Sequence, residues 1–351
     1  MGHDRIHTAR FVSFCSGTND FTSNLTEPNL ALEGPMDTLS ATPHSATLRG
    51  VSLPTNEARI LEQRIALWVV VIPFLALLVG IVLLLRSAVG RVEVLLLLGM
   101  YWLSHVGIGL GYHRHFSHRS FQTTRPIKAI FASLGSMAAQ GPIVTWAATH
   151  RRHHTFSDHQ GDPHSPHLHE PGVINTLKGA WHAHTGWMFT SEVHDWVYYV
   201  PELVKDRMIM KINRYYFVWV LLGLAIPAAL GALLIGGWRG AGDGLLWGGL
   251  IRIALGHHST WSVNSICHIF GTRKYRSNDL SRNNPFMAIA VFGEGWHNNH
   301  HSFPSSAFHG LEWWQVDLHA YVIRLLKLFH LAWDLKRPSE QTLKQKLIVA
   351  A

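Results

Sequence analysis

Residues 94–118 read VLLLLGMYWLSHVGIGLGYHRHFSH, in which an apolar run leads directly into three histidines. The run 94–112 is long enough to cross about 30 Å of hydrocarbon as an α-helix. Short turns would join it and its neighbours in pairs, so the sequence predicts an all-α integral membrane protein with two helical hairpins. The four transmembrane helices are expected at about 65–85, 94–112, 215–238 and 244–263.

The composition of the 351-residue chain fits a membrane protein with one histidine-rich side. Hydrophobic residues make up 47% of the chain and charged residues 15%, a balance that excludes an intrinsically disordered protein. Two cysteines are too few for a disulfide scaffold or a cysteine-based zinc module. The net charge of +8 is not concentrated in a basic arm, so we expect no nucleic-acid partner.

Positively charged residues predict the orientation in the membrane. The second of the two short turns is expected at Gly242–Asp243. Only three of the 30 lysines and arginines lie near these turns: Arg86, Arg91 and Arg239. Because cytoplasmic loops carry the excess of lysine and arginine, both termini and both large loops should face the cytoplasm. Arg252 lies within the fourth span, where a charge is costly, and should therefore contact protein or a polar cavity.

Three histidine clusters predict a metal centre. They are HRHFSH at 113–118, HRRHH at 150–154 and HNNHH at 297–301, and NSICH at 264–268 adds an amide and an imidazole. In the second and third clusters, the spacing i, i+3, i+4 places three imidazoles on one helix face. The nine candidate ligands are His113, His118, His150, His153, His154, His268, His297, His300 and His301, and Asn264 could act through a metal-bound water.

Nine imidazoles overfill one tetrahedral zinc site but suit two metals with five or six ligands each. Imidazole binds iron, zinc, copper and nickel, so ligand type alone does not select the metal. Asp162 and Glu294 are candidate partners that orient the imidazoles. Five other histidines are expected to be surface or hydrogen-bonded residues: His115, His164, His167, His169 and His309. His257 and His258 are expected to line the interior of the fourth span without binding a ligand.

The uncharged stretch Ala129–Ala148 is ambiguous, because its length would allow a fifth span. A span here would place the first and second histidine clusters on opposite sides of the membrane. We therefore predict that it is an interfacial or half-buried helix. Residues 61–335 would form the membrane domain, with a flexible N-terminal tail at 1–60 and a C-terminal tail at 336–351.

Together, HRHFSH, HRRHH, NSICH and GEGWHNNHHSFP (293–304) resemble the motifs of membrane fatty-acyl desaturases of the stearoyl-CoA, or delta-9, type. The resemblance runs from about residue 60 to 335. It implies a four-span fold whose cytosolic helical cap holds a di-iron centre on the nine histidines, and a kinked tunnel for the acyl chain. Trp146 and Trp261 match family positions near the substrate.

The resemblance also implies the reaction, in which dioxygen becomes two waters while the acyl chain gains a double bond. Two electrons come from the substrate and two from an external donor such as ferredoxin, or a cytochrome with its reductase. A fused haem domain is not indicated, because the stretch His-Pro-Gly-Gly is absent. A related di-iron hydroxylase or acetylenase would use the same centre. A His-rich metal transporter is a weaker alternative, since it would place its ligands near the middle of the spans.

Several positions depart from the animal acyl-CoA enzymes. Ala148 and Gly141 replace an Arg and an Asn that contact coenzyme A there, and QGP at 140–142 is closer to the bacterial branch. The acyl group could therefore be carried on a lipid, an acyl carrier protein or CoA. Tyr101 matches a residue at the tunnel end, and His105, one turn later, replaces a small residue. A larger side chain there predicts an acyl substrate shorter than stearoyl, unless His105 points to a neighbouring helix.

Overall fold

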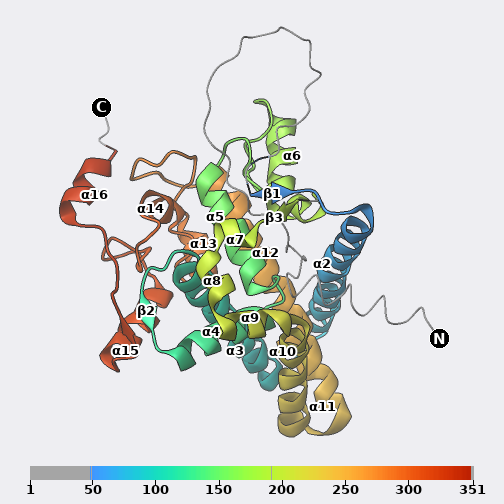
Figure 1. Cartoon of the computed structure of the whole chain (residues 1–351). Coiled ribbons are helices and arrows are strands. Elements are labelled where there is room, and N and C mark those ends of the chain that lie inside the picture. Colours follow the sequence, from blue (N-terminus) through green and yellow to red (C-terminus); the bar gives the residue numbers. More distant parts are fainter. Residues whose placement is uncertain (1–47, 49, 191, 349–351) are drawn as a thin grey trace.

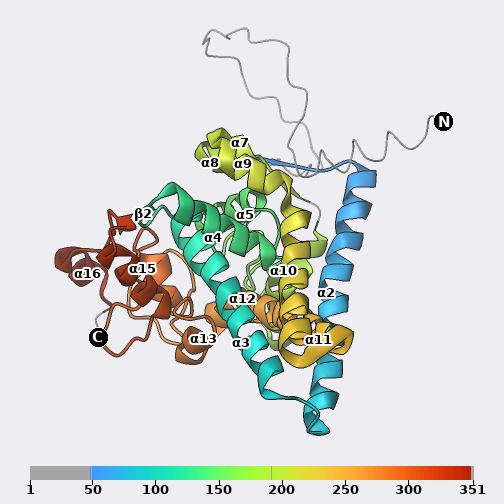
Figure 2. The same cartoon turned by 90° about the horizontal axis from the view of Figure 1, so that it is seen from below.

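The structure, a computed structural model, describes residues 48, 50–190 and 192–348 and is mostly helical (Figure 1). Three helical stretches are long and apolar enough to cross a membrane, judged by length and composition: Asn56–Leu85, Arg91–Ser117 and Tyr216–Ile269. Figure 2 shows the long helices side by side, with the shorter elements gathered at one end. The predicted tail at 1–60 lies mostly outside the described residues.

The first two long helices follow each other through a short turn. Helix α2 (Asn56–Leu85) starts at Thr55, whose hydroxyl accepts a hydrogen bond from the Ala58 N–H, and most of its large apolar side chains are exposed. The chain turns at Ser87 into α3 (Arg91–His105), which continues as a π-helix, η1 (Val106–Ser117). Every side chain of η1 is buried, so this half of the second helix lies inside the protein.

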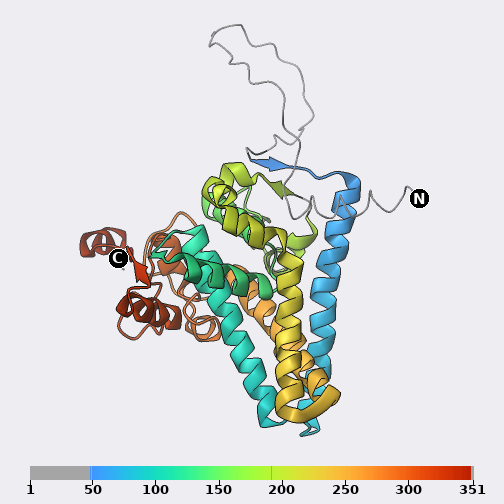
Figure 3. The same cartoon turned by 60° about the horizontal axis from the view of Figure 1, so that its bottom comes forward.

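The third stretch, 216–269, is a helical hairpin in itself. Gly236 and Gly237 both have positive φ, and the chain reverses there because glycine adopts this conformation without strain. The Cα of Gly244 then packs against Gly231 of the outgoing arm. Figure 3 shows the two arms, coloured yellow to orange, side by side. Its elements are α10 (Tyr216–Gly231), η3 (Ala232–Gly236), α11 (Gly237–Gly244), η4 (Leu245–Ile251) and α12 (Arg252–Ile269).

The turn predicted at Gly242–Asp243 is wrong, because both residues belong to helix α11. The sequence offers glycines at both places, and the adjacent pair at 236–237 provides two consecutive flexible positions. The hairpin therefore turns about six residues earlier than its apolar pattern indicates.

The stretch 129–148 folds back on itself instead of forming one long helix. It is divided between α4 (Arg125–Met137) and α5 (Ile143–Phe156), and the turn between them contains positive φ values at Ala139 and Gly141. Helix α4 packs closely on η1: a Cβ on Gly107 would lie 2.2 Å from the backbone nitrogen of Gly135. This close approach explains the glycine at 107, and a Cβ on Gly135 would lie 2.3 Å from the Tyr112 ring.

Arg252 is fully buried and joins four parts of the fold, in agreement with its expected contact with protein. Its guanidinium donates to the backbone oxygens of Gly248 (3.1 Å), Met137 (2.9 Å) and Gly223 (2.6 Å), and to the Ser104 hydroxyl (3.2 Å). Because Met137 ends α4, the cation also stabilises the negative end of that helix.

The remaining elements cover the histidine clusters. Two short antiparallel sheets pair β1 with β3 and β2 with β4. Helix α16 lies within 336–351, the stretch that we assign to a tail. These elements are β1 (Val51–Ser52), β2 (Gln122–Thr123), α6 (Val173–His184), η2 (Gly186–Phe189), β3 (Val193–His194), α7 (Trp196–Tyr199), α8 (Pro201–Lys205), α9 (Arg207–Arg214), α13 (Pro285–Ala290), α14 (His297–Ser302), α15 (Leu318–Leu328), β4 (Ala332–Trp333) and α16 (Glu340–Lys346).

Candidate metal centre

All nine candidate histidines come together in two neighbouring groups, and within each group the ligand atoms lie within 4.8 Å of one another. Group 1 contains His113, His118, His150, His154 and His300. Group 2 contains His153, His268, His297 and His301.

The helical spacing divides each cluster between the two groups. On α5, His150 and His154 belong to group 1, whereas His153 belongs to group 2. On α14 the division is reversed, since His300 belongs to group 1, whereas His297 and His301 belong to group 2. One helical turn of each helix therefore serves both groups, which keeps the groups adjacent.

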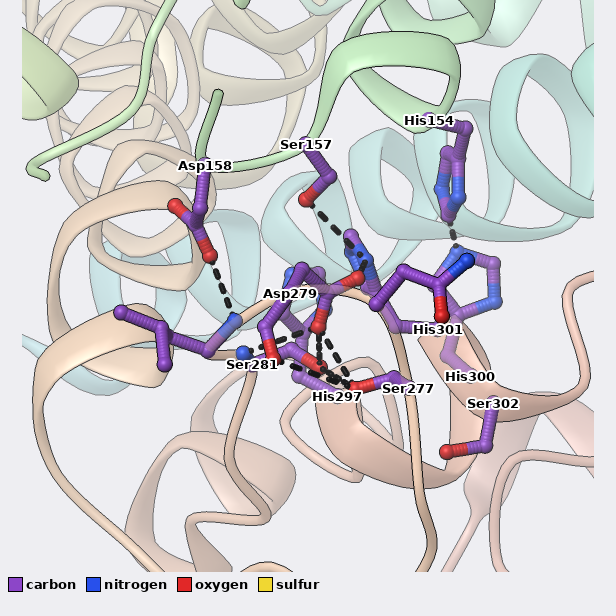
Figure 4. Close-up of polar contacts among 12 residues, drawn as sticks. His154, Ser157, Asp158, Ser277, Asp279, Ser281, His297, His300, His301 and Ser302 are labelled. Carbon is purple, nitrogen blue, oxygen red and sulfur yellow. Dashed lines mark hydrogen bonds and ion pairs between the residues drawn. The ribbon is translucent and has the colours of Figure 1, made fainter. Parts of the chain in front are cut away.

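Within each group, the Nε2 atoms point at one another. In group 1, the Nε2–Nε2 distances are 3.0 Å for His113–His300 and 2.7 Å for His118–His150. The distance is 2.9 Å for His300–His154, the pair that Figure 4 shows. In group 2 they are 3.0 Å for His268–His297 and 3.4 Å for His153–His301.

Four of the nine imidazoles are held from behind by buried carboxylates. The Nδ1 atoms of His113, His153, His268 and His301 lie 2.6, 3.0, 2.8 and 2.7 Å from oxygens of Glu294, Asp162, Asp158 and Asp279, respectively. Each carboxylate accepts a hydrogen bond from the Nδ1–H of its imidazole, which leaves the Nε2 lone pair directed into the group.

This donor set fits a metal cation. His153 and His301 both place Nδ1 on a carboxylate, so their Nε2 lone pairs face each other across 3.4 Å and repel unless a cation or proton lies between them. With metal–nitrogen distances of about 2.1 Å, two imidazoles at right angles would place their nitrogens about 3 Å apart. The observed separations match that value.

The electrostatics of group 2 also favour a cation. Burial raises the pKa of the Asp279 carboxyl, but His301 and the hydroxyls of Ser281 and Ser277 lower it more, so the net pKa is below the usual value. Burial lowers the pKa of His301 to about 4, even though Asp279 opposes the shift. At neutral pH the group therefore combines an uncharged imidazole with an anionic carboxylate, as a metal requires.

Comparisons with known proteins identify the chain. The model of the family described as "Fatty acid desaturase" matches residues 91–333. The chain belongs to the fatty acid desaturase family. A hex-5-enoyl-[acyl-carrier protein] acetylenase of Moorena producens is 48% identical over 79% of this chain and 87% of its own.

Two other relatives act on different carriers. The sn-1 stearoyl-lipid 9-desaturase of Anabaena variabilis is 39% identical over 68% of this chain and 81% of its own. The acyl-CoA C20 Δ5-desaturase of Anemone leveillei is 40% identical over 67% of this chain and 70% of its own. This chain is therefore a desaturase-family enzyme, and membership leaves the carrier open.

The residues expected to line the tunnel of this desaturase occupy two regions. Trp146 stacks on His150, with ring centroids 5.1 Å apart, and so lies against group 1. Trp261 is buried on α12 next to His257. Asn264 is half-buried on the same helix, one turn before His268.

Tyr101 and His105 lie deeper between the long helices. The Tyr101 hydroxyl donates to the Ala290 oxygen (2.8 Å), and its ring contacts that of His105 at 4.5 Å. The Nε2 of His105 lies 3.1 Å from the Ser259 hydroxyl on α12. His105 thus bridges two long helices, and Gln140 and Gly256 lie with it around a gap too narrow to hold water.

Several residues at the site are not predicted from the sequence. Asp162 and Glu294 are expected from their positions beside histidine clusters, whereas Asp158 and Asp279 are not. His309, expected to be only a surface or hydrogen-bonded residue, is buried at the site, and its Nδ1 lies 3.0 Å from Glu294. The available signal for Asp158 is its position four residues after His154. Asp279 has no comparable signal, because its loop reaches the site only in the folded protein.

Proposed function

We propose that each histidine group holds one iron ion and that the enzyme uses dioxygen to introduce a double bond into a fatty-acyl chain. The observation that carries this proposal is the convergence of nine imidazoles, four of them backed by carboxylates, into two adjacent groups. Asn264 would contact the metal of group 2 through water. When bound, the two irons supply the reduction of dioxygen to two waters, with two electrons from the acyl chain and two from an external donor.

The protein's own residues would position the chain and exclude water. Trp146, stacked on His150, offers an apolar wall beside group 1, and Trp261 offers another on the facing helix. Such walls hold the reacting carbons of a saturated chain, which has no polar group to grip, at a fixed place. The buried Arg252 fixes the end of α4 and thereby the turn that carries Gln140.

We further propose a short acyl chain on acyl carrier protein as the substrate. His105 points to Ser259 on the neighbouring helix α12, which is the alternative to a short tunnel, so this proposal rests on the relative's name and leaves His105 as a residue to test. The acetylenase of Moorena producens is named for a six-carbon chain on acyl carrier protein, which supports the same size and carrier. Ala148 and Gly141 provide no polar side chains for a coenzyme A group.

Formation of a triple bond is a second candidate. It is favoured by the 48% identity to an acetylenase over most of both chains. Conversion of an alkene to an alkyne removes two hydrogens by the same redox balance, so the same centre would serve. Only the bonding of the two carbons in the bound substrate differs.

For the membrane, we propose four crossings, by α2, by α3 with η1, and by the two arms of 216–269. The reversal at Gly236–Gly237 and the antiparallel packing of the arms support two crossings in that stretch. The cap with the metal centre and both termini would face the cytoplasm, because only Arg86, Arg91 and Arg239 lie near the opposite turns. The membrane domain would span 61–335.

The test is product analysis with the iron-loaded enzyme in lipid nanodiscs, reduced ferredoxin and a series of acyl carrier protein substrates from hexanoyl to stearoyl, with hex-5-enoyl added. Mass spectrometry should find loss of two hydrogens, with the highest turnover on the shortest chains. Gain of oxygen would indicate a hydroxylase, and preference for stearoyl would contradict the short tunnel. His153→Ala is the inactive control.

A further inference from the structure

Residues 271–284, between α12 and α13, form a loop that covers group 2. The loop is fixed at three points: Asp279 Oδ2 lies 2.7 Å from His301 Nδ1, the Leu280 N–H donates to Asp158 (2.8 Å), and the Arg282 N–H donates to the Cys267 oxygen (2.7 Å). Figure 4 shows Asp279 between His301 and the hydroxyls of Ser277 and Ser281. The loop is therefore an integral wall of the centre.

This wall is only one residue thick. Asp279 is 9% exposed and contacts His301, while its chain neighbours Asn278 and Leu280 face solvent, Leu280 with 39% of its surface. The exposed His159 joins the same surface, since its Nε2 lies 3.0 Å from the Asn278 oxygen. An electron arriving here would have a short path to group 2, through Asp279 and His301.

The surface around this thin wall is positively charged. Helix α16 packs beside the loop, where the Arg276 N–H donates to the Lys346 oxygen (2.7 Å). Three carboxylates oppose the basic residues: Glu312, which pairs with Lys274, Glu340, and the largely buried Asp279 of the loop itself. We name this region the basic loop surface, and its members are Arg273, Lys274, Arg276, Arg282, Lys344 and Lys346.

We propose that the basic loop surface is the docking site of a small acidic one-electron carrier protein of the ferredoxin type. This inference rests on the proposed function, whose balance requires electrons from outside: the acyl chain, dioxygen, two electrons and two protons give the alkene and two waters. Each docked carrier is oxidised by one electron, so two carriers bind in succession. Opposite charges steer such brief encounters and raise their rate.

The experiment uses the full-length protein in nanodiscs of uncharged lipid, with purified plant-type [2Fe–2S] ferredoxin as the probe, and measures binding by interferometry. The double variant Arg276→Glu/Lys344→Glu reverses two exposed charges of the surface. The matched control, Lys205→Glu/Arg207→Glu, reverses two exposed charges at α8 and α9. We expect the double variant to bind ferredoxin about tenfold more weakly at low salt, and the difference to shrink as salt rises.

Equal binding by the double variant and the wild type, or an equal loss in the control, would overturn the proposal. Holo acyl carrier protein, which is also acidic, is measured in parallel. If the double variant loses affinity for that protein and keeps its affinity for ferredoxin, the surface serves the substrate carrier and our assignment is wrong. Product formation by the wild type is tested separately, and its absence would contradict the proposed function instead.

Discussion

The Nε2 atoms of His118 and His150 lie 2.7 Å apart, although all of α4 and half of α5 separate them along the chain. Both ends of the stretch 129–148 therefore meet at one group of histidines. A single helix of that length could not return to its starting point, and the turn at Ala139 and Gly141 provides the return. We therefore propose that the stretch is apolar because it packs within the protein, and that it does not cross the membrane.

Cysteine labelling tests this topology. In a background with Cys15→Ser and Cys267→Ser, we expect Arg125→Cys and Gln160→Cys, both exposed, to react from the same side of the membrane. Ala88→Cys, exposed in the turn after α2, should react from the opposite side. The readout is modification by a membrane-impermeant maleimide in inside-out and right-side-out vesicles. Opposite labelling of the first two positions would show that the stretch crosses.

The carboxylates behind the imidazoles should control metal affinity. Asp279→Asn removes the negative charge that holds the Nδ1 proton of His301, so the ring is less well oriented and less basic. We expect the affinity of group 2 for divalent metal to fall about 10- to 100-fold, and bound iron to fall from about two towards about one per chain. Chelator competition and elemental analysis give these values.

Glu312→Gln is the control for that change. Glu312 pairs with Lys274 on the same loop but contacts none of the nine histidines, so its loss should leave metal affinity unchanged. Equal iron content in Asp279→Asn and the wild type would contradict the role of the carboxylate.

The sequence predicts the parts of this molecule that depend on local periodicity. The spacing of His150, His153 and His154 places them on one helix turn, and the structure does bring these residues together with the other clusters. Helical periodicity does not predict that Asp279 and His309 reach the centre, because both lie on loops and no short-range pattern marks the path of a loop. The prediction of a turn at Gly242–Asp243 is wrong for a related reason. An apolar run shows how long a helix can be, but not where the helix ends.

Arg252 should contribute strongly to stability. Arg252→Met would leave the buried oxygens of Met137 and Gly223 without their donor, a loss of about 2–4 kcal/mol in the free energy of unfolding. Thermal unfolding in detergent should show a clearly lower midpoint. Arg239→Met, at an exposed position, should change the stability by no more than about 0.5 kcal/mol. Equal midpoints for the two variants would mean that the contacts of Arg252 are not needed.

His105 should set the length of the acyl chain. In His105→Ala, the ring that lies between Tyr101 and Ser259 is removed, so the internal space extends and the preferred substrate should become longer by several carbons. Ser259→Ala removes the hydrogen bond and keeps the ring, which makes it the matched control. If bulk decides the length, competition among acyl carrier protein substrates should show a shift in His105→Ala and almost none in Ser259→Ala. A similar shift in both variants would instead mean that the bridge acts by holding α3 against α12, because both changes break the same contact.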